Sequence, residues 1–137
     1  MFKFYNDKHF SRYLEVRGRM GGSDRDPYRA AVAYLIALDC VLYEHMCDVF
    51  DFDNGVIKPE CLNKGWQTGT SKKTSRLAFN LWNGYCSEGE PLEEETPSSY
   101  YTPEQIFCCL EYAPYYWQAI RIRFEMDEYN SLEAAQE

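Results

Sequence analysis

One stretch of the chain combines hydroxyl groups, a glycine and clustered positive charge just ahead of an amphipathic helical pattern. It runs from Trp66 to Gly84 and reads WQTGTSKKTSRLAFNLWNG. Four apolar side chains at i, i+1, i+4 and i+5 predict the buried stripe of a helix: Leu77, Ala78, Leu81 and Trp82. The helix is expected to begin near Ser71, with Thr70 or Ser71 as its cap and Gly69 at positive φ in the preceding turn.

The chemistry that this stretch suits best is anion binding. A helix N-terminus presents unpaired N–H groups and about half a positive charge, which favours phosphate or carboxylate. Lysines in a first turn oppose the helix dipole, and a bound anion would offset that repulsion. Trp66 could stack on a nucleobase or belong to the core. The candidate ligand site comprises the hydroxyls, the cations and this indole: Trp66, Thr68, Thr70, Ser71, Lys72, Lys73 and Arg76.

The motif TGTSKKT is not a phosphate-binding P-loop. That loop requires a glycine, four residues and then Gly-Lys-Ser/Thr, and neither Gly65 nor Gly69 begins such an arrangement. A well-capped surface helix with solvated lysines therefore stands as the alternative interpretation of the same residues.

The run WQTGTS, followed by a basic pair and RLAFNLWNGY, resembles the signature of a small family of uncharacterised proteins, a domain of unknown function. That family occurs in Firmicutes and in their phages and mobile elements. The resemblance covers most of residues 1–125 and extends to four further blocks: Asp26-Pro27-Tyr28, Val49-Phe50-Asp51, Ile106-Phe107-Cys108-Cys109 and Tyr112-Ala113-Pro114-Tyr115. It implies a setting in mobile elements and supplies no reaction or ligand.

The sequence contains no constellation typical of an enzyme. His9 and His45 are the only histidines, neither lies in an HExxH motif, and there is no GxSxG. The six cysteines include no CxxC pair, so zinc spacing is absent. A calcium loop with Gly55 at its sixth position would place Cys61 at the twelfth, where a bidentate glutamate is needed. We therefore expect a protein that is not an enzyme and uses neither metal nor cofactor.

The charge of the chain is strongly segregated. Residues 1–83 carry 12 basic and 10 acidic side chains, a net +2, whereas residues 84–137 carry 2 and 12, a net −10. The overall −8 argues against direct binding of nucleic acid, which needs a basic face. The same segregation is compatible with a homo-oligomer assembled head to tail.

A second functional hypothesis follows from the acidic half. Its loop, about residues 86–100, could mimic nucleic acid and occupy the basic groove of a host defence nuclease such as a CRISPR effector. The candidate partner-binding residues are acidic or aromatic: Glu90, Glu93, Glu94, Glu95, Tyr100 and Tyr101. A third hypothesis is a regulatory helical module in which neither charged region matters.

At 137 residues the chain is predicted to form one compact, mainly α domain of about five or six short helices. A first helix is expected to stop near Gly18 and to carry a stripe of Phe10, Tyr13, Leu14 and Arg17. Asp26 and Pro27 predict the start of a central buried helix. A hairpin is expected at Asn54-Gly55.

Near the C-terminus, Thr102 and Gln105 form a predicted capping box, launching a helix that carries Ile106, Phe107 and Leu110. A final helix restarts at Pro114 with a stripe of Tyr116, Ile120 and Phe124, and the tail 128–137 is expected to fray. No signal peptide is recognisable, and the longest uncharged apolar run, residues 30–38, is far shorter than the ~20 residues of a membrane span. A soluble, cytoplasmic protein is expected.

Overall fold

The computed structural model of the chain describes residues 2–87 and 97–126. Most of the predicted acidic loop 86–100 and the predicted frayed tail 128–137 lie outside the described residues. The end of that predicted loop is helical, because Pro97–Tyr101 forms a 3-10 helix, η2. Within the described parts, no helix is both long and apolar enough to cross a bilayer.

The mainly α architecture is confirmed, with one two-stranded hairpin. The described residues contain seven α-helices, more than the five or six expected, because short breaks at Asp39 and His45 divide the segment after the central helix. The elements follow in this order: α1 (Asp7–Met20), α2 (Pro27–Leu38), α3 (Cys40–Glu44), α4 (Met46–Val49), β1 (Phe50–Asp51), β2 (Val56–Ile57), η1 (Pro59–Asn63), α5 (Gly69–Asn83), η2, α6 (Pro103–Phe107) and α7 (Ala113–Arg123).

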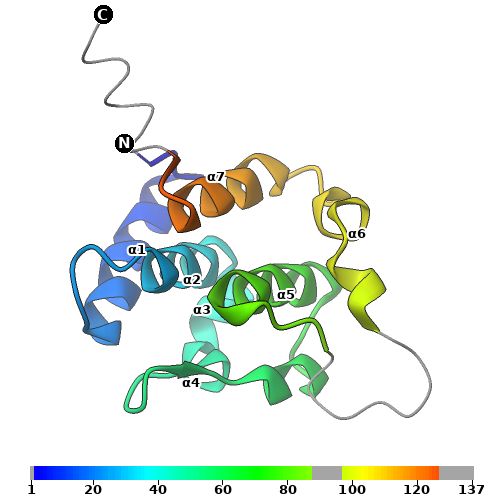
Figure 1. Cartoon of the computed structure of the whole chain (residues 1–137), viewed down its shortest axis with the longest axis horizontal. Helices are drawn as coiled ribbons and strands as arrows, with labels where there is room; N and C mark the ends of the chain where they lie inside the picture. The colour runs from blue at the N-terminus through cyan, green and yellow to red at the C-terminus, as the bar shows by residue number, and fades with distance from the viewer. Residues whose placement is uncertain (1, 88–96, 127–137) are drawn as a thin grey trace, which may run out of the picture.

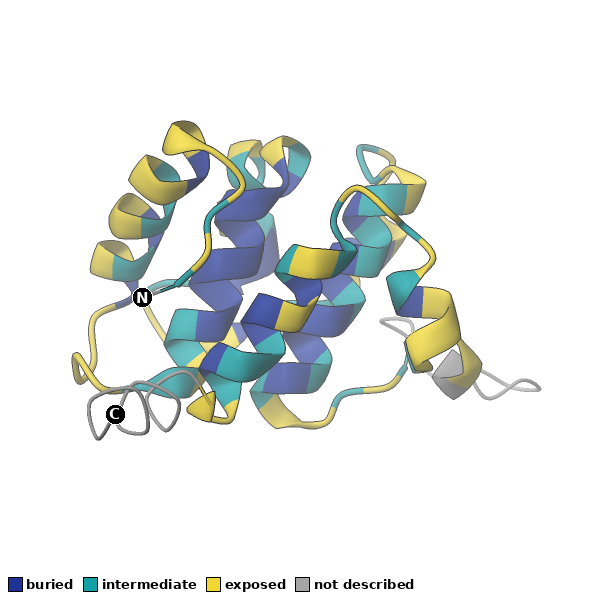
Figure 2. Cartoon of the chain, turned by 90° about the horizontal axis from the view of Figure 1, so that it is seen from above, coloured by how far each residue is buried: buried dark blue, intermediate teal, exposed yellow. Residues whose placement is uncertain are grey.

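Helix α2 is the centre of the molecule, as its sequence predicts. The Asp26 side chain caps it by accepting hydrogen bonds from the backbone N–H groups of Tyr28 and Arg29, and Pro27 occupies the first turn. Every residue from 31 to 38 is buried. Helices α1, α5 and α7 pack around it, and the buried surfaces of α2 and α5 face the interior (Figures 1 and 2).

The predicted stripe of α1 is out of phase with the observed one. The buried residues are His9, Val16 and Met20, whereas Phe10 and Leu14 are exposed. The Phe4 ring packs edge-on against His9 at 5.1 Å and covers this side of the helix, a contact that no helical periodicity reveals. The helix also continues past Gly18 to Met20.

The hairpin at Asn54-Gly55 is confirmed. Phe50 pairs with Ile57 in the antiparallel register, and Gly55 takes φ +70° at the turn. A Cβ atom at this glycine would lie 2.8 Å from Nη2 of Arg29, so a substitution would displace the end of that side chain as well as strain φ.

The C-terminal helices differ from the prediction in length and phase. The Thr102 side chain accepts a hydrogen bond from the Gln105 N–H, as expected, but α6 ends at Phe107 and leaves Leu110 85% exposed. Helix α7 buries Tyr116 as predicted, whereas Phe124 lies beyond its end and is exposed.

Candidate functional site

Three cations lie on the outward face of α5. Lys72 and Arg76 are one helical turn apart, and Lys73 lies beside them, so the three share the side of the helix opposite its buried residues. All three side chains are partly exposed. We call Lys72, Lys73 and Arg76 the α5 cationic face.

Little negative charge on the described surface compensates this face. Within residues 2–87 and 97–126, Asp26 forms an ion pair with Arg29, and the Asp48 carboxylate lies 3.8 Å from Nδ1 of His45. Neither Lys72 nor Lys73 pairs with any described acidic residue. Two unneutralised ammonium groups next to each other favour an anion that can bridge them.

The start of α5 differs from the prediction by about one half-turn. Thr68 is the N-cap: its hydroxyl accepts the Ser71 N–H at 2.9 Å, and the Ser71 hydroxyl accepts the Thr68 N–H at 2.7 Å. Gly69 therefore belongs to the helix and does not take positive φ. The N–H groups of Gly69 and Thr70 have no acceptor among the described residues, and they remain open to an anion.

One of the three predicted hydroxyl donors faces the protein interior, as do two further hydroxyl residues of α5. Ser71 is fully buried, and its hydroxyl donates to Oε1 of Gln67 at 2.5 Å. Thr74 and Ser75 are also fully buried. The hydroxyls of Thr68 and Thr70 remain at the surface, but the Thr68 hydroxyl already accepts the Ser71 N–H as the cap of the helix.

Trp66 is engaged within the chain. Its ring stacks on the His45 imidazole with centroids 4.3 Å apart and the planes 1° from parallel. Its indole nitrogen is buried without a hydrogen-bond partner in the described structure. The indole face turned toward His45 is therefore not available to a ligand.

The structure joins one residue from each of the two predicted sites. The Arg76 guanidinium lies 4.5 Å from the centroid of the Tyr100 ring, and that ring is 43% exposed. Tyr101 is half-buried, and its hydroxyl donates to the carbonyl of Ser87. Glu90, Glu93, Glu94 and Glu95 lie outside the described residues.

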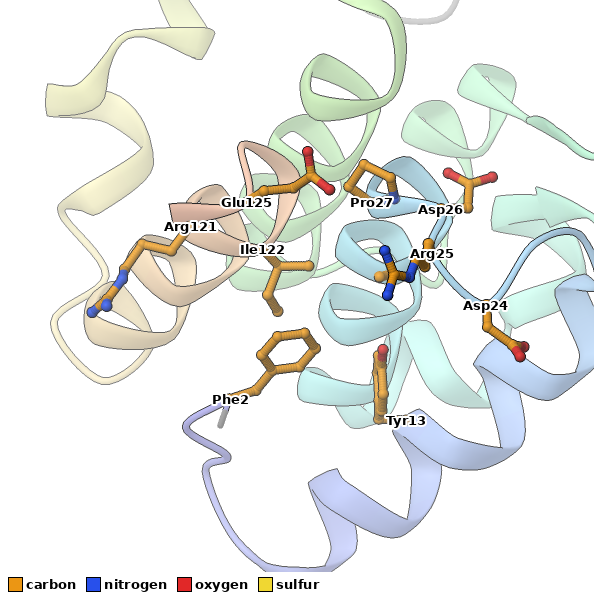
Figure 3. Close-up of a pocket in the computed structure, with 10 residues that line it drawn as sticks. Phe2, Tyr13, Asp24, Arg25, Asp26, Pro27, Arg121, Ile122 and Glu125 are labelled. Carbon is orange, nitrogen blue, oxygen red and sulfur yellow. The ribbon is translucent and has the colours of Figure 1, made fainter. Parts of the chain in front are cut away.

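The sequence did not point to a concave site that lies away from α5. A cavity of about 240 Å³ opens between the N-terminal segment, α1, the start of α2 and the end of α7 (Figure 3). Its aromatic lining comes from Phe2 and from Tyr13, which the sequence analysis placed only on the stripe of the first helix. The signal that could have drawn attention to it is the charge-rich run Asp24-Arg25-Asp26 before α2.

The fold is that of a small, mainly helical protein, and among the described residues no three His, Cys, Asp or Glu side chains form a group that could hold a metal ion. The chain belongs to the family DUF6075, a family of unknown function, which matches residues 1–136. No curated protein and no solved structure matches the chain.

Proposed function

We propose that this chain is a non-enzymatic protein that binds and sequesters a phosphate-bearing, nucleotide-type ligand on the α5 cationic face. The observation that carries the proposal is the grouping of Lys72, Lys73 and Arg76 on one exposed side of α5, with the Tyr100 ring stacked on Arg76. This grouping places positive charge beside an exposed aromatic ring. A nucleotide carries the complementary groups, a negatively charged phosphate and a base that can stack.

Each group has a distinct role in this proposal. The two lysines neutralise phosphate charge, and the free N–H groups of Gly69 and Thr70 donate to phosphate oxygens. The nucleobase stacks on Tyr100 and not on Trp66, because the His45 ring already stacks on a face of the Trp66 indole. Arg76 holds Tyr100 in place through its own stacking contact.

The biological setting is also a proposal. The resemblance to proteins of phages and mobile elements supports a role in counter-defence, in which a host signalling nucleotide is removed by sequestration. All six cysteines are free, which supports a reducing, cytoplasmic location.

A thermal-shift screen tests the proposal. The full chain is heated at fixed salt with cyclic oligonucleotides, ADP-ribose derivatives, NAD and ordinary nucleotides. A ligand at 100 times its Kd adds about 2.7 kcal/mol, which raises the melting temperature of such a domain by several degrees. We expect Lys73→Ala and Arg76→Ala to abolish that rise and Lys8→Ala, an exposed lysine on α1, to preserve it. A rise that all three variants retain contradicts the assigned surface.

The acidic-inhibitor hypothesis is the second candidate, favoured by the net −10 of residues 84–137. It proposes that this half binds the basic groove of a host defence nuclease. Replacing Glu93, Glu94 and Glu95 by glutamine should then abolish inhibition, whereas Lys73→Ala should leave inhibition unchanged. The opposite pattern supports nucleotide sequestration, and a regulatory helical module predicts no effect of either change.

A further inference from the structure

The cavity between α1, α2 and α7 has an apolar floor and a charged rim. Phe2, Ala30 and Ile122 line its interior, while Arg25 and Glu125 stand at its edge (Figure 3). None of its lining residues belongs to α5, so it is separate from the α5 cationic face. Its volume, about 240 Å³, is below the ~300–1,000 Å³ of sites for drug-sized ligands. A molecule smaller than a nucleotide fits such a space.

Two polar groups at this cavity lack a partner within the described structure. The Tyr13 ring packs edge-on against Phe2, with centroids 6.1 Å apart, but its hydroxyl has no hydrogen bond. Burial raises the pKa of Tyr13, so the hydroxyl stays protonated and can donate at neutral pH. The Arg25 side chain forms no ion pair with a described residue, since the neighbouring Asp26 is bound to Arg29 at 2.6 Å. Figure 3 shows the Tyr13 hydroxyl directed toward Arg25.

The backbone at Glu125 supplies an independent observation. Glu125 follows the C-cap of α7 with φ +58°, and it is the one non-glycine residue at positive φ in the described parts of the chain. Glycine is the usual residue at this position, because a side chain there is strained. Glu125, which carries this strain, lies on the wall of the cavity.

We propose that this cavity binds a small zwitterion with an apolar side chain, the chemical class of free amino acids. The Arg25 guanidinium and the Tyr13 hydroxyl receive the carboxylate, and the Glu125 carboxylate receives the ammonium group. The apolar side chain packs on Phe2 and Ile122. This arrangement gives each charge of the zwitterion an opposite charge on the cavity wall, which also carries Asp24, Asp26 and Arg121, and it fills the apolar floor.

Matched ligands test the two charged contacts separately. The full chain is titrated calorimetrically with L-phenylalanine, with phenethylamine, which lacks the carboxylate, and with 3-phenylpropanoate, which lacks the ammonium group. We expect L-phenylalanine to bind and each analogue to bind about tenfold more weakly, because each loses one charged hydrogen-bonded contact. Equal affinities for the three, or no heat with L-phenylalanine at millimolar concentration, overturn the proposal.

Paired variants add a crossed prediction. Arg25→Gln should weaken L-phenylalanine and 3-phenylpropanoate while leaving phenethylamine unchanged, and Glu125→Gln should weaken L-phenylalanine and phenethylamine while leaving 3-phenylpropanoate unchanged. Both residues are exposed, so both variants are expected to fold, which circular dichroism checks. Lys8→Gln is the control. Affinities that follow neither pattern contradict the assignment of the carboxylate to Arg25 and of the ammonium group to Glu125.

A third variant separates binding from stability. Glu125→Gly relieves the positive φ and should raise the thermal unfolding midpoint while weakening L-phenylalanine. If the substitution instead damaged the fold, both the unfolding midpoint and the affinity for L-phenylalanine would fall. Unchanged affinity for L-phenylalanine in Glu125→Gly, with the midpoint raised, shows that the strain serves no ligand and overturns the proposal.

Discussion

At the scale of single residues, His9 is a buried polar side chain whose hydrogen bonds are all made within the protein. The buried His9 ring is held at both nitrogens: Nδ1 accepts the Tyr5 N–H at 3.0 Å, so the neutral ring carries its proton on Nε2, which donates to the Tyr34 carbonyl at 2.9 Å. Because both ring nitrogens are bonded and the ring is buried, His9 is a site where pH acts on the stability of the fold.

Acidification should destabilise the fold through His9. Burial, assisted by the Arg12 charge, lowers the pKa of His9 to about 4, although the hydrogen bond to Tyr34 opposes the shift. The contribution of a neutral His9 is fully present above pH ~6.5, the unfolded value. It is lost as pH falls from there to the folded value, by about 3 kcal/mol in total.

Chemical denaturation between pH 4 and 7.5 measures this loss, with His9→Gln as the variant that cannot titrate. NMR titration of the His9 ring gives its pKa directly, even where His9→Gln folds poorly. A ring that titrates near 6.5 in the folded protein contradicts the buried, neutral state.

The hydroxyl of Thr74 makes a buried contact that links α5 to α7. Its Oγ1 lies 2.6 Å from the Tyr116 hydroxyl, and it also donates to the Thr70 carbonyl at 2.9 Å, so the tyrosine is the donor between the two hydroxyls. Tyr116→Phe should cost about 1 kcal/mol, because Thr74 keeps one bond. Thr74→Val should cost about 1–3 kcal/mol, because it leaves a buried tyrosine hydroxyl unpaired.

Urea denaturation of both single variants and of the double variant forms a complete mutant cycle. Additive losses of unfolding free energy in that cycle contradict a direct bond between the two hydroxyls.

At the scale of elements, local signals set where several helices begin. Asp26 and Pro27 mark the start of α2, and Asn54-Gly55 marks the hairpin, since each acts on its own backbone. The start of α5 is not set by one residue type, because Thr68, Thr70 and Ser71 can each cap a helix. Because Thr68 is the N-cap, Ser71 lies at the third helical position. Its hydroxyl there turns back to the cap and into the interior.

Replacing glycine by alanine is expected to have opposite effects on stability at two positions of the helices. Gly84 ends α5 at φ +77°, and an added Cβ would meet no atom within 4 Å, so Gly84→Ala should cost about 1 kcal/mol through backbone strain alone. Gly18 lies inside α1, also in open space, so Gly18→Ala should stabilise by roughly 0.5–1 kcal/mol. Thermal unfolding of both variants tests the pair, and shifts of the same sign contradict it.

At the scale of the whole molecule, long-range contacts determine what the sequence could not reveal. The α5 cations and Tyr100 were assigned to separate hypotheses, yet folding stacks Tyr100 on Arg76. Trp66 pairs with His45, 21 positions away, which no local pattern encodes. The phase of α1 and the cavity beside it likewise depend on the N-terminal segment, which follows no helical period. The fold class and the candidate cations could thus be predicted from the sequence. The residues that pack against the candidate site residues in the folded protein could not.

The most direct test of ligand binding by α5 is an NMR titration of the full chain at constant ionic strength. ADP is compared with adenosine, which carries the same base without phosphates. We expect ADP to shift the backbone amide signals of Gly69, Thr70 and Tyr100 strongly and adenosine to shift them weakly, and we expect Lys72→Ala/Lys73→Ala to remove the difference. Equal shifts with both ligands, or shifts confined to the cavity beside α1, would contradict phosphate recognition by α5.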